Sequence, residues 1–425
     1  MAGEHVTFDS GPVRGELEVP GDKSISHRAL IAGAAAVTSL RISGLNAGRD
    51  VRATRDALGA LGAVISSDAR AVTVARAALR SPRTALDCMN SGSTARMLLG
   101  VCAGANLAAR FDGDASLRRR PMEPVAAQLR AFGARIETTQ GRLPLEIRGT
   151  PQIETRHFIL LRPSAQVKSA LLFAALFGGV AVQIDGDRGS RDHTERMIGH
   201  LGGEIEWGGT TARLGARPLD GGQIDVPGDF SSAAFFITAA VVTPGSSVVL
   251  RNVGVNPTRI GLLEALREMG AAIELRRPRA WSGEPVADIA AEHRSLRGCR
   301  IDAGMALRAI DEIPLLAVAA AFAEGVTTVD GASDLRTKES DRLAAIGRLC
   351  ESVGIECANE GPRLVISGGA PQSRGGAVSA EGDHRIAMAA AVLAGGAGPL
   401  SVDSADSIEV SFPGFLEAWR RRGRG

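Results

Sequence analysis

The hydrophobic and polar positions of this chain of 425 residues follow a pattern that occurs six times. In each copy an amphipathic helix ends at a glycine, and alternating β-branched residues then predict a strand. The glycines lie about 70 residues apart, with one longer interval: Gly62, Gly133, Gly202, Gly270, Gly354 and Gly423. The last copy is truncated. A repeat of this kind predicts six copies of one βα unit.

Each repeat contains a second helix that is apolar on nearly all sides and begins at Ser, Asp or Asn, which are good helix caps. A helix of this kind is buried. The six segments are 24–37, 91–104, 164–179, 229–242, 311–325 and 383–396. The sequence therefore predicts a mixed α/β fold with one amphipathic and one buried helix per repeat.

The six repeats divide into three and three. The sequence VPGDKS at 19–24 recurs as VPGDFS at 226–231, and Pro-Gly marks a turn at both places. We expect an N-terminal domain at 20–227 and a C-terminal domain made of 1–19 and 228–425, with hinges near 19–22 and 226–229. The first strand, at about 1–19, would then belong to the C-terminal half. The alternative is two ordinary loops with a chance match.

Composition limits the class of protein. Apolar residues make up 44% and charged residues 23%, which suits a core of ordinary size, and the net charge of +2 argues against a nucleic-acid-coating surface. The five cysteines show no metal-ligand spacing, which favours reduced thiols: Cys88, Cys102, Cys299, Cys350 and Cys357. We find no signal peptide and no membrane-spanning run. We therefore expect a cytoplasmic protein without membrane or nucleic-acid partners.

Lysine is rare in this chain. Of the 49 basic residues only Lys23, Lys168 and Lys338 are lysines, and all three lie in polar clusters. Lysine is a compact point charge with a tunable pKa, which arginine cannot replace. These three positions are therefore candidates for chemistry or for phosphate contact.

The buried helices begin at clusters of polar residues. The first cluster is Asp22-Lys23-Ser24 with Arg28, where free N–H groups and the helix dipole would help two cations to bind an anion. A capped core helix with two surface cations is the alternative. The other clusters of the N-terminal half are NSGST (90–94) before Arg96, three arginines within 113–124, SAQVK (164–168) and SRDHTE (190–195). Of the three arginines, one would point inward and the others would be solvated.

The C-terminal half adds acids to the bases. Asp311 and Glu312 precede one buried helix, and His384 and Arg385 precede another. The segment 335–343 is read as helical, with Lys338 and Arg342 on one face and Glu339 about 100° away. Each cluster could instead consist of ordinary caps and salt bridges. Cations at helix N-termini are nevertheless unfavourable unless an anion offsets them, so together the clusters predict a substrate with several phosphates or carboxylates.

In this order and spacing, the motifs GDKSISHR, NSGST with Arg96, RRPM, SAQVKSA, DEIP, KESDR and DHR resemble the 5-enolpyruvylshikimate-3-phosphate (EPSP) synthase family. The resemblance covers essentially the whole chain. It implies a two-domain inside-out α/β barrel with three βαβαββ-type repeats per domain. It also implies transfer of the enolpyruvyl group of phosphoenolpyruvate to the 5-hydroxyl of shikimate 3-phosphate, with release of phosphate and without metal or organic cofactor. Both substrates are small molecules of aromatic amino acid biosynthesis, and we expect a monomer.

The resemblance also implies roles for individual residues. Shikimate 3-phosphate would be bound by Lys23, Ser24, Arg28, Ser164, Ala165, Gln166, Arg191, Asp311 and Lys338. Ala165 replaces a serine of many relatives, so it can offer only its backbone. Phosphoenolpyruvate would be bound by Lys23, Gly92, Arg120, Gln166, Arg342 and Arg385. Val410, before Ser411-Phe412-Pro413, stands where some relatives have a lysine, and this contact is therefore missing.

The same resemblance implies an addition–elimination mechanism. Asp311 would take the proton of the 5-hydroxyl, and Glu339 would protonate the methylene carbon, giving a tetrahedral intermediate. Lys23 could share either role. The space at Gly92 implies sensitivity to glyphosate, a competitor of phosphoenolpyruvate in this family.

Two other functions stay open at this point. A UDP-N-acetylglucosamine enolpyruvyl transferase would share the fold, but it typically uses a cysteine in a Gly-rich loop as its acid, and none of the five cysteines lies in such a loop. A non-catalytic phosphate-binding repeat protein would not need the acids that lie among the basic clusters.

Overall fold

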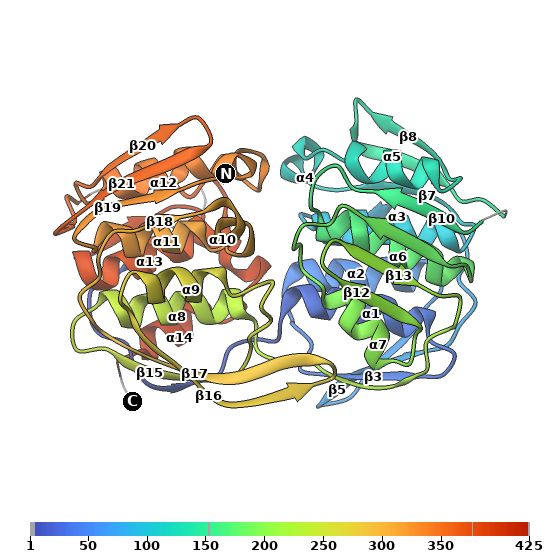
Figure 1. Ribbon diagram of the computed structural model, residues 1–425, viewed down its shortest axis with the longest axis horizontal. Coiled ribbons are helices and arrows are strands. Elements are labelled where there is room, and N and C mark those ends of the chain that lie inside the picture. Colours follow the sequence, from blue (N-terminus) through green and yellow to red (C-terminus); the bar gives the residue numbers. More distant parts are fainter. Residues whose placement is uncertain (1–4, 152–153, 376, 424–425) are drawn as a thin grey trace. The chain divides into compact units, whose positions relative to one another are not determined.

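The computed structural model describes residues 5–151, 154–375 and 377–423, and the chain forms two compact units (Figure 1). Unit 1 contains the residues up to Pro20, Gly228–Arg279 and those from Pro285 onward, and unit 2 contains Gly21–Pro227 and Ala280–Glu284. The chain thus passes between units at both Pro-Gly sequences. It also does so twice around 280–284, which the expected domain boundaries had assigned to the C-terminal domain.

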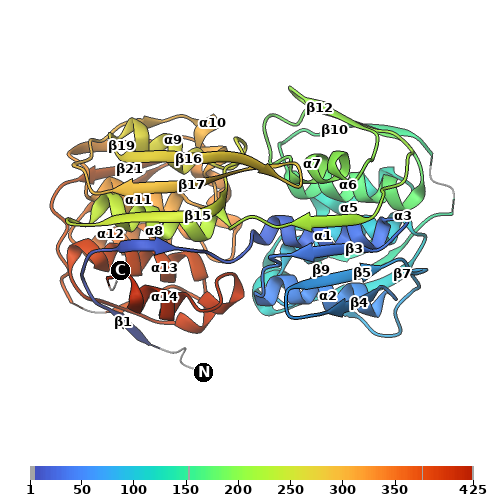
Figure 2. The same cartoon turned by 90° about the horizontal axis from the view of Figure 1, so that it is seen from below.

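Unit 2 has three buried helices inside and three four-stranded sheets outside (Figure 2). The buried helices are α1 (Lys23–Ala35), α3 (Gly92–Gly104) and α6 (Ala165–Gly178). The sheets are β14 (Gly222–Asp225), β3 (Leu40–Ser43), β5 (Ala71–Ala75) and β4 (Val64–Ser67); β6 (Leu86–Asp87), β7 (Ala108–Asp112), β9 (Arg142–Arg148) and β8 (Arg135–Thr139); and β10 (Arg156–Ile159), β11 (Val182–Asp185), β13 (Thr211–Leu214) and β12 (Ile205–Gly208). The remaining helices are α2 (Arg49–Ala60), α4 (Ala115–Arg119), α5 (Glu123–Ala131) and α7 (His193–His200).

Unit 1 repeats this plan around the buried helices α8 (Phe230–Val242), α11 (Ile313–Ala321) and α13 (His384–Ala397). Its sheets are β16 (Ala272–Trp281), β17 (Glu284–Glu292), β15 (Ser247–Gly254) and β2 (Arg14–Leu17); β18 (Arg300–Ile301), β19 (Gly325–Val329), β21 (Arg363–Gly368) and β20 (Glu356–Glu360); and β1 (Val6–Phe8), β23 (Leu400–Val402) and β22 (Ala377–Val378). The remaining helices are α9 (Gly261–Glu268), α10 (Ala303–Arg308), η1 (Ala332–Thr337), α12 (Arg342–Glu351), η2 (Ala405–Val410) and α14 (Phe415–Arg421).

The four-stranded sheets share one topology: a parallel pair at one edge and two antiparallel neighbours after it, as in β14–β3–β5–β4. In unit 2, β14 lies near the end of the stretch Gly21–Pro227 and pairs with β3, so it completes the sheet of the first repeat. In unit 1, β2 does the same beside β15. This arrangement is the predicted inside-out α/β fold with βαβαββ-type repeats, and it is confirmed.

The glycines that end the amphipathic helices explain how each helix turns into a strand. Five of the six predicted ones have φ between +76° and +113°, a conformation that glycine adopts without strain. Gly423 does not adopt it, and the residues after it lie outside the described part of the chain. The expected first strand is in fact two strands, β1 and β2, because Gly11 and Pro12 interrupt it.

Close packing of the buried helices depends on small residues. A Cβ atom on Gly100 of α3 would lie 2.1 Å from the carbonyl oxygen of Ala170 in α6, and one on Gly104 would lie 2.2 Å from that of Ala174. The two backbones can therefore approach only because both positions are glycine. This close contact fixes the N-termini of α3 and α6, where candidate site residues lie.

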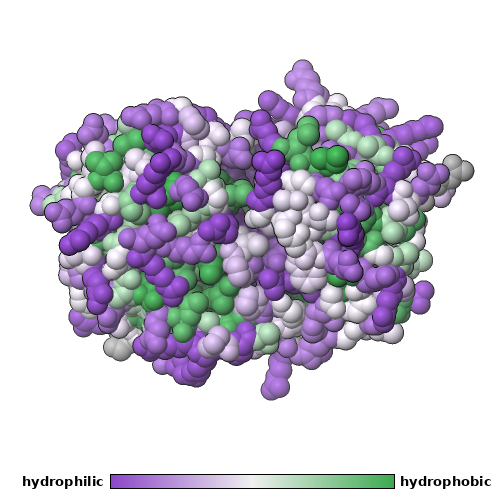
Figure 3. Space-filling view, viewed as in Figure 1, coloured by the Kyte–Doolittle hydropathy of each residue, from purple (hydrophilic) through white to green (hydrophobic). Residues whose placement is uncertain are grey.

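The outer surface is mixed. On the face drawn in Figure 3, hydrophobic residues are interspersed with hydrophilic ones. Within the described part of the chain, none of the helices combines the length and the apolar character that crossing a bilayer requires. All five cysteines are free thiols.

Candidate active site

Asp311 is the centre of the candidate cluster in unit 1. It lies just before α11, and three cations from other parts of the chain surround its carboxylate. The distances are 3.6 Å to Lys338 Nζ, 3.6 Å to Arg342 Nη1 and 3.8 Å to Arg385 Nη2. These distances exceed hydrogen-bond range, so the three cations attract the Asp311 carboxylate electrostatically. Arg385 Nη1 in addition donates to the backbone carbonyl oxygen of Asp311 at 3.2 Å. The structure thus brings four of the predicted residues of unit 1 together.

Glu339, the fifth predicted residue of unit 1, is bound to the same cluster through Arg342. Arg342 is almost completely buried and donates to Glu339 Oε2 at 2.7 Å and to Asp383 Oδ2 at 2.7 Å. Burial would lower the pKa of Arg342, but the charges of Asp383 and Glu339 outweigh burial and raise it. Arg342 is therefore a permanent cation that fixes the carboxylate of Glu339 next to Asp311.

Arg385, the second residue of α13, is held by a buried carboxylate that the sequence analysis did not assign to the site. Its Nη1 lies 3.2 Å from Glu312 Oε1 and 3.0 Å from Ser231 Oγ. Glu312 is fully buried and also accepts from Arg259 Nη1 at 2.6 Å. Glu312 therefore orients Arg385 relative to Asp311, its neighbour in the sequence.

The helix expected over 335–343 is not continuous, and this prediction is wrong. The 3-10 helix η1 ends at Thr337, Lys338 has extended backbone angles, and α12 begins only at Arg342. The cause is Asp341, whose carboxylate accepts from Ala344 N at 3.2 Å and caps α12. Lys338 and Arg342 therefore meet at Asp311 because the chain bends, and not because they share a helix face.

In unit 2, Lys23 is the first residue of α1. Asp22 caps this helix by accepting from Ile25 N at 2.8 Å. Lys23 Nζ donates to Asp50 Oδ2 of α2 at 2.9 Å. Asp50 gave no signal in the sequence, because it lies within an ordinary amphipathic helix. Its contact with Lys23 depends on the packing of α1 against α2.

Arg28, one turn further along α1, is buried among neutral oxygen atoms. Its guanidinium donates to the carbonyl oxygen of Ser24 at 2.9 Å, to Ser169 Oγ at 2.9 Å and to Thr194 Oγ1 at 2.7 Å. Arg191 Nη1 reaches Ser24 Oγ at 3.5 Å. The structure thus brings Ser24, Arg28 and Arg191 together, as the sequence analysis expected.

The N-termini of α3 and α6 meet through Gln166. Its Oε1 accepts from Arg96 Nη1 at 2.7 Å, and its Nε2 donates to Ser93 Oγ at 3.0 Å. Ser164 caps α6 through Val167 N at 3.4 Å, and the carbonyl oxygen of Ala165 accepts from Ser169 Oγ at 2.6 Å. The backbone of Ala165 is thus joined to the partners of Arg28.

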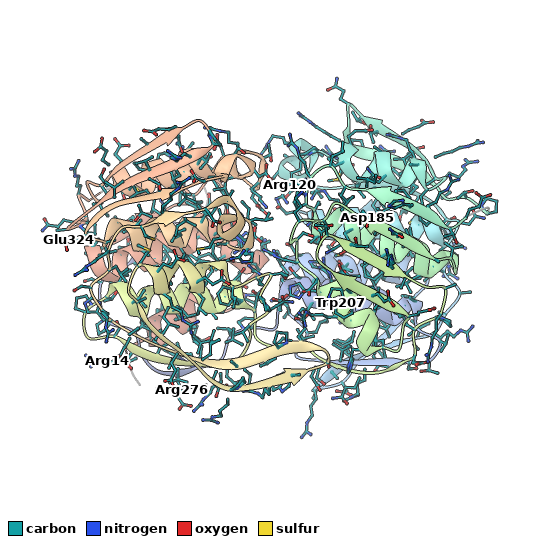
Figure 4. All side chains as sticks on the ribbon, viewed as in Figure 1. Arg14, Arg120, Asp185, Trp207, Arg276 and Glu324 are labelled. Carbon is teal, nitrogen blue, oxygen red and sulfur yellow. The ribbon has the colours of Figure 1, made fainter. Side chains whose placement is uncertain are left out.

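Gly92 and Arg120 lie beside this contact. A Cβ on Gly92 would lie 3.4 Å from Arg120 Nη1. Arg120 directly follows α4 (Figure 4), is 8% exposed and donates to Asn90 Oδ1 at 2.7 Å, whereas Arg118 and Arg119 are exposed. The prediction that one of the three arginines points inward is confirmed, and Arg120 is the one.

Lys168 differs from the other two lysines because it is almost completely buried between two carboxylates. It is 2% exposed, and Nζ lies 2.5 Å from both Asp187 Oδ2 and Glu195 Oε1. Burial would lower the pKa of Lys168, but the charges of Glu195 and Asp187 outweigh it and raise the pKa. Lys168 is therefore an internal ion-pair partner that joins α6 to α7.

The comparisons with known proteins agree on one family. The family model described as EPSP synthase (3-phosphoshikimate 1-carboxyvinyltransferase) matches residues 9–419. The chain belongs to the EPSP synthase family. It is 44% identical to the 3-phosphoshikimate 1-carboxyvinyltransferase of Anaeromyxobacter sp., over 98% of this chain and 97% of that one. It is 46% identical to the enzyme of that name from Thermus thermophilus, over 96% of each chain.

Solved structures support the same assignment. An EPSP synthase from Acinetobacter baumannii has a TM-score of 0.87 and 37% identity, and the match covers 100% of this chain and 98% of that one. The enolpyruvyl transferase NikO from Streptomyces tendae has a TM-score of 0.79 at 18% identity over 99% of this chain and 98% of that one, so it shows the shared fold alone. Membership of the EPSP synthase family confirms the resemblance given by the seven motifs.

One departure from the pattern of some EPSP synthases has a place in the structure. Val410 is the last residue of η2. Two residues later, Phe412 is 3% exposed and packs against Phe236 and Phe415 of the unit 1 core. The backbone at Val410 is therefore firmly anchored, but its side chain offers no cation.

Proposed function

We propose that the clusters of unit 1 and unit 2 act on the same pair of substrates, shikimate 3-phosphate and phosphoenolpyruvate. The chain is an enolpyruvyl transferase of the shikimate pathway, since both the family and its closely similar relatives carry this activity in their names. The single observation that supports the assignment of the site is the position of Asp311, a carboxylate with three cations within 4 Å. Such an arrangement suits a base that works beside anionic substrates.

Shikimate 3-phosphate is assigned mainly to unit 2. Its phosphate would take charge-assisted hydrogen bonds from Lys23, Ser24, Arg28 and Arg191, and further contacts from Ser164, Gln166 and the backbone of Ala165. The ends of α1 and α6 support this assignment because free N–H groups at a helix N-terminus bind anions. Asp311 and Lys338 of unit 1 are assigned to the ring hydroxyls.

Phosphoenolpyruvate is assigned to a second set of cations, which shares Lys23 with the first. In unit 2 these are Lys23 and Arg120, with Gly92 and Gln166 beside them, and in unit 1 they are Arg342 and Arg385. Asn90 keeps Arg120 oriented at 2.7 Å, and Glu312 keeps Arg385 oriented at 3.2 Å. Because these partners hold the cations before substrate arrives, little reorganisation remains for binding.

The chemistry follows from the two acids. Asp311 accepts the proton of the 5-hydroxyl as its oxygen attacks C2 of phosphoenolpyruvate, and Glu339 delivers a proton to the methylene carbon C3. The product of this addition is a tetrahedral intermediate. In the elimination Glu339 takes back a proton from the methyl group that has formed, the C–O bond to phosphate breaks, and the enolpyruvyl group remains on the 5-oxygen of shikimate 3-phosphate. We assign Lys23 the role of neutralising charge on phosphate.

The test measures phosphate release and binding separately. We expect Asp311→Ala and Glu339→Gln each to lower kcat by about 10² to 10⁴-fold, the usual contribution of a general acid or base. Both variants should still bind shikimate 3-phosphate in calorimetry, because its phosphate contacts lie in unit 2. Asp334→Asn, an exposed acid in η1, is the control and should match the unchanged enzyme. A near-normal rate in either active-site variant overturns its assigned role.

The identity of the acceptor substrate is tested by replacing shikimate 3-phosphate with UDP-N-acetylglucosamine. Phosphate should appear when phosphoenolpyruvate is mixed with shikimate 3-phosphate and not when it is mixed with UDP-N-acetylglucosamine. We further propose that the chain works in the cytoplasm, a reducing compartment that the free thiols favour. We also propose that it is a monomer. Light scattering during gel filtration tests the oligomeric state.

A further inference from the structure

The turn of the hairpin β16–β17 belongs to a different unit from most of its strands. Residues 280–284 form part of unit 2, whereas the chain before and after them belongs to unit 1. The turn consists of Ser282 and Gly283, with φ of +48° and +83°. Positive φ at both central residues is typical of the tight type I′ turn, in which glycine is favoured. The sequence analysis assigned no role to this turn.

Three contacts attach the turn to unit 2. Asp225 N donates to Ser282 Oγ at 2.8 Å, and Arg196 Nη1 donates to the carbonyl oxygen of Gly283 at 3.4 Å. A Cβ on Gly283 would lie 3.0 Å from the carbonyl oxygen of Arg196, so the backbone of the turn touches α7. The third contact is an ion pair or hydrogen bond between Glu284 and His193.

The Glu284–His193 contact is buried. Glu284 Oε1 lies 2.7 Å from His193 Nδ1, and the two residues are 4% and 2% exposed. A buried carboxylate is costly unless a partner satisfies it, so this contact fixes both side chains. His193 is the first residue of α7 and comes two residues after Arg191. The contact therefore sets the start of α7 and the exit of the loop that carries Arg191.

The first turn of α7 carries this constraint to the assigned phosphate site. Its three consecutive side chains have three different partners: His193 contacts Glu284, Thr194 accepts from Arg28 Nε at 2.7 Å, and Glu195 pairs with Lys168 at 2.5 Å. Burial lowers the pKa of Arg28 to about 10, while Glu195, Asp22 and Glu284 oppose this shift and Arg191 adds to it. The negative charge of Glu284 thus helps to keep Arg28 protonated.

We propose that Glu284 is a positioning residue for the phosphate site of shikimate 3-phosphate, acting through His193 on the loop of Arg191 and through Thr194 on Arg28. This inference rests on the proposed function, in which Arg28 and Arg191 bind that phosphate. Glu284 itself does not need to touch the substrate. Its role is to hold the first turn of α7, so that two cations meet the phosphate in one arrangement.

The experiment separates the two substrates. We expect Glu284→Ala to raise KM for shikimate 3-phosphate about tenfold, the effect of losing one charge-assisted hydrogen bond, and to change KM for phosphoenolpyruvate less than about twofold. Glu284→Gln keeps an oxygen that can accept from His193 and should recover part of the loss. Glu292→Ala, an exposed acid at the other end of β17, is the matched control and should leave both constants unchanged.

A double-mutant cycle distinguishes positioning from a merely structural role. In an Arg191→Ala background, Glu284→Ala should raise KM for shikimate 3-phosphate by a clearly smaller factor than in the unchanged chain, because part of its target is gone. Three results overturn the proposal. The first is that Glu284→Ala changes KM for shikimate 3-phosphate and KM for phosphoenolpyruvate by the same factor, and the second is that it raises KM for shikimate 3-phosphate equally with and without Arg191→Ala. The third is that neither Glu284→Ala nor Glu284→Gln changes KM for shikimate 3-phosphate. If the unchanged chain releases no phosphate from the two substrates, the proposed function itself has failed.

Discussion

Gly92 is the first residue of α3, and the Arg96 guanidinium lies where a side chain at this position would begin. A Cβ on Gly92 would lie 2.6 Å from Arg96 Nη1, well inside van der Waals contact, so Gly92→Ala must displace Arg96. Arg96 donates to Gln166 at 2.7 Å, and Gln166 is assigned to phosphoenolpyruvate. We expect Gly92→Ala to raise KM for phosphoenolpyruvate about tenfold and KM for shikimate 3-phosphate much less.

The measurement is phosphate release with one substrate varied at a time. Gly59→Ala in α2 is a suitable control, because nothing lies within 4 Å of the added Cβ and the position is exposed. Because glycine at position 92 lets Arg96 and Arg120 approach, we also expect glyphosate to inhibit the unchanged enzyme competitively with phosphoenolpyruvate, and Gly92→Ala to weaken this inhibition. An inhibition curve that stays flat into the millimolar range for the unchanged enzyme contradicts the prediction.

Sequence reasoning at this scale found residues that carry their own signal. The residues alone indicated that one of three arginines points inward, the family resemblance singled out Arg120, and Arg120 is the buried one. Asp50, Glu312 and Glu284 were not recognised as partners of site residues, because a lone acid in an amphipathic helix, a helix cap or a hairpin looks the same wherever it packs. Their roles depend on contacts between residues 27 to 91 positions apart.

At the scale of elements, Asp383 links the helices α12 and α13 of unit 1. It caps α13 by accepting from Arg385 N at 2.9 Å, and it accepts from Arg342 Nε, at the start of α12, at 2.7 Å. Burial would raise the pKa of Asp383, but the attraction of Arg342 outweighs burial and holds the pKa below its ordinary value. The ionised form is therefore the one that the folded state stabilises.

This shift predicts a pH dependence of stability. A carboxyl whose pKa is lowered by folding stabilises the fold fully above its unfolded pKa of about 3.8, and this contribution is lost as the pH falls through the lower folded value. We expect Asp383→Asn to cost about 3 kcal/mol in the unfolding free energy at pH 7, because Arg342 loses a buried partner. The difference from the unchanged chain should shrink below about pH 4.

Urea unfolding at pH 7 and at several acidic pH values measures this difference. Glu381→Gln is the control. Glu381 lies two residues before Asp383 and forms an exposed ion pair with Arg348, and such pairs contribute about 0 to 1 kcal/mol to the unfolding free energy. A difference between Asp383→Asn and the unchanged chain that is constant across the acidic range would falsify the assigned role of the charge.

The elements themselves were predicted where local rules decide them. The glycines with positive φ and the caps Asp22, Ser91 and Ser164 occur where the repeat places them, because a helix end and a cap are decided within a few residues. The segment 335–343 misled because charged residues suit a helix surface and a loop equally. There Asp341 caps α12, so the helix begins at Arg342 and does not include Lys338 despite the helical spacing of Lys338 and Arg342.

At the scale of the whole molecule, each unit has a hydrophobic core of its own. Among the described residues, the core built around α1, α3 and α6 and the core built around α8, α11 and α13 have no member in common. The three-and-three division of the repeats already predicted this, because a buried helix needs neighbours of its own kind. The passage of the chain through the turn at 280–284 could not be predicted, because it depends on where the hairpin packs.

Separate cores predict separate unfolding steps. The chain contains three tryptophans and no tyrosine. Trp419 of α14 is 2% exposed and stacks on Phe415 in unit 1, whereas Trp207 and Trp281 belong to unit 2. A variant with Trp207→Phe and Trp281→Phe therefore reports the unfolding of unit 1 by fluorescence, while far-ultraviolet circular dichroism reports both units.

In that variant we expect circular dichroism to show two unfolding transitions. The fluorescence of Trp419 should follow only the transition of unit 1. Adding Phe173→Ala, which removes a buried ring of α6 in unit 2, should cost about 3 to 5 kcal/mol and move the other transition alone. Adding Phe236→Ala, which removes a ring beside Trp419, is the matched substitution and should move the Trp419 transition. A single transition that both substitutions shift equally would mean that the two cores unfold as one cooperative unit, and the chain crossings between the units would then couple them strongly.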